Sequence, residues 1–279
     1  TSDGRIVVLS GGVDSNTGEM VGMLQSELGE AGRIAISSPL TLILSLNPDI
    51  DELDLIAQLG MAGVEEAGLL YYDPVAEMGS DSSNPILAEY VFTVQQQLFS
   101  VIQAGTVIAG SSSGLSALDV AVKAVGQAIS DALATGDAIT VSQISDAAIK
   151  SISASSGLST TLADGLAAVV SQTNTKISTA YSGLASALSD PTNTDAIAVL
   201  SSAKAAAAAS QDTLLKAVES ALSSGTVNTV AYQTTLDSAI AEKLAVFDFV
   251  LKANAGLESN TLSEPLLFPR CVTRQLCMA

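Results

Sequence analysis

A short stretch near the N-terminus, Ser-Gly-Gly-Val-Asp-Ser, contains residue types that could bind a phosphate group. An apolar segment at residues 6–9 precedes it and predicts a strand that leads into a turn. Two adjacent glycines would let backbone N–H groups approach a pyrophosphate, and the serine hydroxyls would add hydrogen-bond donors. A nucleotide-binding function is therefore one hypothesis for this stretch. Its candidate residues are Ser10, Gly11, Gly12, Asp14 and Ser15.

The same stretch resembles the SGGxDS loop of the ATP pyrophosphatases, enzymes that adenylylate a substrate and release pyrophosphate. The resemblance implies a doubly wound parallel sheet, in which strands and helices alternate, and it needs a helix over residues 19–28. The sequence beyond residue 40 predicts no buried parallel strand, and the first lysine is Lys123. An adenylylating enzyme is therefore the alternative interpretation, and a non-enzymatic protein is the main one.

The composition limits the classes of partner and reaction. The chain has 279 residues, no histidine and a net charge of −18, from 29 acidic and 11 basic residues. Without histidine a Ser-His-acid triad cannot form. Nucleic-acid binding needs lysine and arginine to displace counterions from phosphates, and anionic membranes repel an acidic protein. We therefore expect no nucleic-acid partner, and an acidic composition rich in serine and threonine suits an extracellular protein.

Neither a membrane span nor a bound cofactor or metal is expected. The longest strongly apolar run, around Pro39 to Leu46, is far shorter than the roughly 20 residues that cross a bilayer. The acidic residues at positions 49–54 lack the spacing and the glycine of a calcium-binding loop. Acidic residues at a helix N-terminus interact favourably with the helix dipole, and this explains the cluster better.

Two cysteines, Cys271 and Cys277, lie close together near the end of the chain. A disulfide that closes a small local loop is one interpretation, and it suits an exported protein. Two unpaired thiols are the other interpretation. The spacing does not decide between them.

Hydrophobic spacing predicts a mainly α-helical protein, an elongated antiparallel helical bundle with a small N-terminal β element. Short strands are expected at residues 6–9, 19–24 and 33–36, and a helix over residues 19–28 competes with the second strand. From residue 38 onwards, apolar residues at steps of three and four predict helices. The expected organisation is a β element at 1–37, a helical subdomain at 38–110, a long-helix bundle at 111–257 and a C-terminal tail at 258–279.

Proline, glycine and capping residues predict where these helices begin and end. Serine or asparagine followed by proline starts helices at Pro39 and Pro85, because proline suits the first helical position. Thr140 and Gln143 have the spacing of a capping box. Residues 158–189 are expected to form one continuous helix, and the last helix is expected to stop at Gly256.

The segment SGGVDSNTGEMVGMLQSELGEAGRIAISSPLTLIL also resembles a module of very large secreted or surface-anchored bacterial proteins, where it occurs among immunoglobulin-like or cadherin-like repeats. The resemblance covers about the first 110 residues and implies an extracellular structural role without known catalysis. This chain departs from that pattern because it has a long helical C-terminal region and no flanking repeats. The matching residues are Gly11, Gly12, Asp14, Thr17, Gly18, Gly22, Leu24, Pro39, Leu40, Thr41, Asp73 and Pro74.

The first predicted strand is the candidate interface. Ile6, Val7, Val8 and Leu9 are all apolar, so both faces of the strand need to be covered. No charge or proline interrupts the run, so it could pair with another chain by strand addition. Packing of the strand against its own bundle is the simpler alternative. The expected partners are further copies of this chain or other surface proteins.

Overall fold

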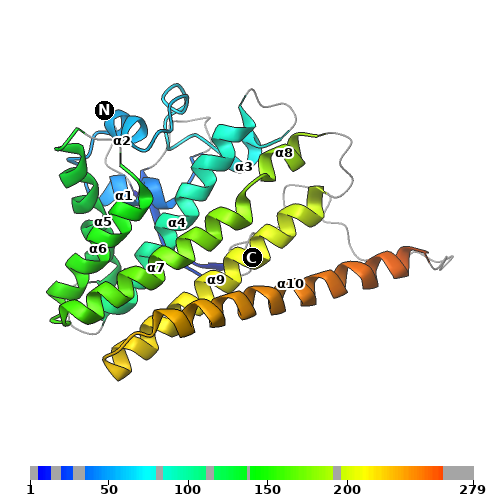
Figure 1. Cartoon of the computed structure of the whole chain (residues 1–279). Helices are drawn as coiled ribbons and strands as arrows, with labels where there is room; N and C mark the ends of the chain where they lie inside the picture. Colours follow the sequence, from blue (N-terminus) through cyan, green and yellow to red (C-terminus); the bar gives the residue numbers. More distant parts are fainter. Residues whose placement is uncertain are drawn as a thin grey trace.

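A computed structural model describes residues 6–13, 20–27, 35–79, 84–110, 116–136, 139–190 and 196–259. Helices dominate this part of the chain, which confirms the prediction of a mainly helical fold (Figure 1). The elements, in chain order, are β1 (Ile6–Val13), β2 (Met20–Glu27), α1 (Pro39–Leu46), α2 (Glu52–Gln58), α3 (Pro74–Glu77), α4 (Pro85–Gly110), α5 (Ala117–Leu133), α6 (Val141–Ser155), α7 (Thr160–Tyr181), α8 (Leu184–Ser189), α9 (Ala196–Ser224) and α10 (Thr229–Ser259).

Capping residues define several helix starts as the sequence predicts. The Ser38 side chain accepts a hydrogen bond from the backbone N–H of Thr41 at the start of α1, with Pro39 at the first helical position. Thr140 and Gln143 form the predicted capping box at the start of α6. Such caps satisfy backbone N–H groups that have no partner within the helix.

The prediction of one continuous helix over residues 158–189 is wrong, because this segment forms two helices, α7 and α8. Gly183 separates α7 from α8 and has a φ of 83°, a left-handed conformation that glycine adopts without strain. The carboxylate of Glu89 on α4 accepts hydrogen bonds from the backbone N–H groups of Gly183 and Ala185. This tertiary contact supports a second helix start that the local sequence does not signal. The last helix, α10, also continues past the predicted stop at Gly256.

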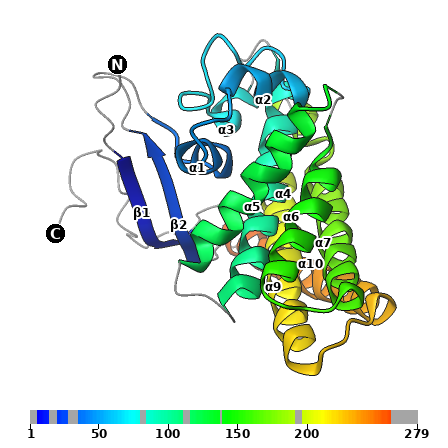
Figure 2. The same cartoon turned by 90° about the vertical axis from the view of Figure 1, so that its left-hand side faces the viewer.

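Helix α4 lies at the centre of the helical layers (Figures 1 and 2). It contacts α1, α3, α5, α6, α7, α8 and α9, and its inward side chains Leu98, Val101 and Ile108 are fully buried. One continuous hydrophobic core extends from Leu40 to Leu236. The core therefore includes residues from both sides of position 110, where the sequence places a subdomain boundary; that boundary stays a prediction.

Polar side chains link α4 to its neighbours inside this core. On α9, the buried Gln211 amide donates hydrogen bonds to Gln96 and Ser100 of α4. On the other side, Gln97 of α4 donates to the backbone carbonyl of Asn174 in α7, and the Asn174 amide donates to Ser145 in α6. Because a buried polar group is costly without a partner, these bonds favour one register between the helices.

The third strand predicted at residues 33–36 is not formed at Ala35 and Ile36, and its first two residues lie outside the described part of the chain. The backbone N–H of Ile36 instead donates a 2.7 Å hydrogen bond to the carbonyl of Leu70. Hydrogen bonding to a turn replaces sheet pairing here, because the loop between α2 and α3 passes beside this segment.

Replacement of Gly105 tests how closely the helices pack around α4. A Cβ at Gly105 would lie 2.7 Å from Cδ1 of Ile152 and 3.1 Å from Cβ of Ala121, so Gly105→Val should overpack the core. We expect a loss of about 2 kcal/mol in the free energy of unfolding, measured by urea denaturation followed by circular dichroism.

Gly110→Val is the matched control in the same helix. A Cβ there would meet only Ala117, at an ordinary contact distance of 3.9 Å, and Gly110 is exposed. The control should change stability by less than about 0.5 kcal/mol. Equal stability of the two variants would contradict the close packing described here.

Candidate functional site

The N-terminal motif lies in a β-hairpin beside the helices. Strands β1 and β2 pair in antiparallel register, with Ile6 opposite Glu27 and Val13 opposite Met20. Figure 2 shows β2 between β1 and α1, so that β1 has the outer position. Among the described residues the sheet contains these two strands alone, and β1 therefore pairs along one edge.

The geometry of the hairpin does not suit the ATP-binding interpretation. Ser10, Gly11 and Gly12 lie within β1, and Gly12 is opposite Val21 in the ladder. The helix that this interpretation needs over residues 19–28 is instead strand β2 up to Glu27. A phosphate loop directs its N–H groups toward the phosphate at a helix N-terminus, whereas these residues lie in a strand that leads into no helix within the described residues. Asp14 and Ser15 lie outside the described residues.

The candidate interface residues occupy the first half of β1. Ile6, Val7, Val8 and Leu9 are opposite Glu27, Ser26, Gln25 and Leu24 of β2. Every residue of a strand directs its backbone N–H and C=O groups sideways, alternately to one edge and to the other. The outer edge of β1 therefore offers backbone donors and acceptors for a further strand.

The acidic cluster at residues 49–54 has a structural role. The Asp51 carboxylate caps α2 by accepting hydrogen bonds from the backbone N–H groups of Leu53 and Asp54. Glu52 accepts a hydrogen bond from the backbone N–H of Leu69 and so holds the following loop against α2. In the described part of the chain, no three Cys, Asp or Glu side chains are grouped so that they could hold a metal ion.

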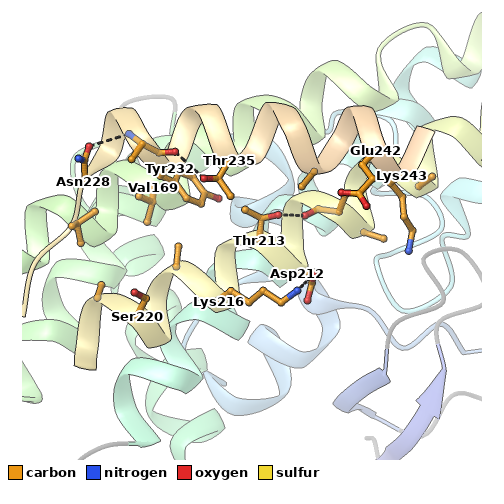
Figure 3. A pocket seen from close by; sticks show the side chains of 18 of the residues that line it. Val169, Asp212, Thr213, Lys216, Ser220, Asn228, Tyr232, Thr235, Glu242 and Lys243 are labelled. Atoms are coloured by element: carbon orange, nitrogen blue, oxygen red, sulfur yellow. Dashed lines mark hydrogen bonds and ion pairs between the residues drawn. The ribbon is translucent and has the colours of Figure 1, made fainter. Parts of the chain in front are cut away.

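A groove between α9 and α10 is a second candidate site, which the sequence analysis did not identify. It has a volume of about 890 Å³, and alanine and valine side chains dominate its walls (Figure 3). Ala205, Ala208 and Ala209 line it from α9, and Ala231 and Ala239 line it from α10. The sequence signal was the alanine run at residues 205–209, because small side chains on facing helices leave space unfilled.

The floor of the groove contains the buried phenol of Tyr232. Its oxygen lies 2.5 Å from the hydroxyl oxygen of Thr173 on α7, and burial raises the pKa of Tyr232 to about 12. Nearby, Lys176 of α7 forms a 2.7 Å ion pair with Asp237 of α10 and lowers the pKa of that carboxyl group. These two contacts attach the first half of α10 to α7.

Charged side chains lie along the rim of the groove. Lys216 and Asp212, one turn apart on α9, form a 2.6 Å ion pair, and Glu242 and Lys243 contribute from α10 (Figure 3). The side chain of Val246 is 58% exposed where the groove opens. The arrangement is that of an apolar channel with a charged rim, which can bind an extended or helical peptide segment.

Comparison with known proteins gives no assignment: no protein-family model, curated protein or solved structure matches this chain. The resemblance to the module of large bacterial surface proteins therefore stays a prediction. None of the described helices is both long enough and apolar enough to cross a membrane. Cys271 and Cys277 lie outside the described residues, so their pairing also stays a prediction.

The Tyr232 phenol provides a spectroscopic test of the groove floor. The chain has five tyrosines and no tryptophan, so absorbance at 295 nm reports phenolate formation directly. In Tyr232→Phe the amplitude of the absorbance change near pH 12 should fall by the amount expected for one tyrosine, because burial raises the pKa of this phenol to about 12. A phenol whose pKa is higher in the folded state stabilises the fold below pH 10, and this contribution disappears as the pH rises toward 12.

The free energy of unfolding should therefore fall less steeply between pH 10 and 12 in Tyr232→Phe than in the unmodified chain. Tyr71→Phe is the control, because Tyr71 is not among the groups that shift the pKa of Tyr232. Loss of the amplitude near pH 10 in Tyr232→Phe, in place of the step near pH 12, would contradict the buried position of the phenol.

Proposed function

We propose that this protein is a non-enzymatic structural module that assembles with further copies of itself through the outer edge of β1. The observation that carries the proposal is the hairpin, in which an eight-residue strand pairs on one side only among the described residues. The proposed location is extracellular or at the cell surface, which the acidic composition supports.

Strand addition would compensate for a weakness of the hairpin. A two-stranded sheet is marginally stable alone, and three or more strands are usually needed. The other strand, β2, lies next to α1, so the outer edge of β1 is the accessible one (Figure 2). The apolar run at residues 6–9 would gain cover from an incoming strand in addition to backbone hydrogen bonds.

The contact determines the form of the assembly. When the incoming strand comes from a different segment of the second copy, each copy donates at one site and accepts at another, and repetition gives an open filament. This is the surface filament or layer that we propose. Because each chain carries a net charge of −18, assembly should strengthen as salt screens the repulsion between copies.

Deletion of residues 1–13 tests this proposal, with deletion of residues 1–5 as the matched control. The longer deletion removes β1, and assembly should be lost in sedimentation velocity and electron microscopy. Helix content by circular dichroism should barely change, since the hydrophobic core extends from Leu40 to Leu236. Continued polymerisation of the longer deletion variant, or its unfolding, would overturn the proposal. Loss of assembly in the control would also contradict it, because deletion of residues 1–5 leaves β1 intact.

Calorimetric titration with ATP and magnesium separates the proposal from the alternative enzyme. We expect no binding heat at micromolar concentrations, because the glycines of the motif lie in a paired strand. Saturable micromolar binding that disappears in Gly11→Val would instead support an adenylylating enzyme.

A further inference from the structure

The groove between α9 and α10 is wide because its walls carry small side chains. Alanines line both helices, and the fully buried Leu236 of α10 is not among the residues that line the groove. The second half of α10 extends away from the other helices (Figure 1). Val246 is 58% exposed there, between Lys243 and the end of the helix. An apolar channel of about 890 Å³ is therefore open at this end.

We propose that the occupant of this groove is the segment of the same chain that follows α10, residues 260–279. The segment has an apolar cluster in Leu266, Leu267 and Phe268, which follows Pro265. Burial of three such side chains favours docking through the hydrophobic effect and opposes the entropic cost of ordering the segment. The inference does not depend on assembly through β1, because the two surfaces lie on different elements.

The length of the chain permits this docking. Helix α10 ends at Ser259, and Val246 lies 13 residues earlier, about 20 Å along the helix axis. An extended chain covers about 3.3 Å per residue, so Leu267, eight residues after Ser259, reaches back about 26 Å. The apolar cluster therefore arrives at the open end of the groove with enough chain left for a reverse turn.

The net positive charge of the segment also suits docking onto the rest of this acidic protein. Residues 260–279 carry two of the chain's 11 basic residues, Arg270 and Arg274, and one of its 29 acidic residues. The remainder of the protein is strongly acidic, whereas the charged side chains that line the groove balance one another, two acidic (Asp212, Glu242) and two basic (Lys216, Lys243). A segment of net positive charge is attracted to the acidic protein as a whole, whereas a second acidic copy of the helical layers is repelled by it.

Disulfide trapping tests the position of the segment. Cys277→Ser leaves Cys271 as the only native cysteine, and Ala239→Cys adds a partner on the groove wall. Under mild oxidation we expect an intramolecular disulfide, seen as a faster-migrating monomer on a non-reducing gel and mapped by mass spectrometry. Formation requires Cα atoms within about 7 Å of each other, so the bond reports close approach.

Ala241→Cys is the matched control, because Ala241 is exposed, lies two residues along the same helix and does not line the groove. We expect at least a tenfold lower disulfide yield there. Equal yields in the two variants would overturn the proposal. Cross-linked dimers in place of monomers would also overturn it, because they would show that the groove binds the segment of a second copy.

A second measurement needs no cysteine and keeps the proposal testable if the variants fold poorly. Amide hydrogen exchange of residues 239–246 should be at least tenfold faster after deletion of residues 260–279, or after Leu267→Asp, than in the full chain. Leu262→Asp should have a smaller effect, because this position precedes the apolar cluster. Unchanged exchange in the deletion variant would overturn the proposal.

Discussion

The close approach of helices at Gly105 is the constraint on which the helical layers depend. A single added Cβ there would collide with Ile152 of α6 and press on Ala121 of α5. Since α4 contacts seven other helices, a shift of α4 at this position would displace most of the core. Small residues at the contacts allow the backbones to approach, and dispersion contacts then accumulate over long stretches of helix.

The same use of small side chains explains why the groove between α9 and α10 stays open. Ala207 of α9, which does not line the groove, is fully buried in the core. Along the groove, the facing alanines of α9 and α10 are too short to fill the space between the two helices. Close packing around α4 and the open groove therefore both result from the use of small side chains at helix contacts.

Two surfaces of the protein are thus available for further contacts, and they differ in chemistry. The edge of β1 offers backbone hydrogen bonds, which any extended segment can use, so its selectivity must come from side chains. The groove offers apolar area with a charged rim, so it selects an apolar segment of suitable charge. High net negative charge limits non-specific association at both surfaces, because copies of the chain repel each other.

Local signals in the sequence were enough to determine the helical class, the starts of α1, α4 and α6, and the acidic N-terminus of α2. Each depends on residues within one turn of the helix, such as the Thr140–Gln143 capping box. The division of residues 158–189 into α7 and α8 could not be predicted in this way, because Glu89, which supports the new helix start, is 94 residues distant from Gly183 in the sequence. The choice between the strand expected at residues 19–24 and the competing helix over residues 19–28 was likewise decided by tertiary structure, and so was the groove. A glycine-rich motif is compatible with a phosphate loop or with a strand, and only pairing with β2 distinguishes them. An alanine run can be covered or left open, and only the packing of the elements around it decides.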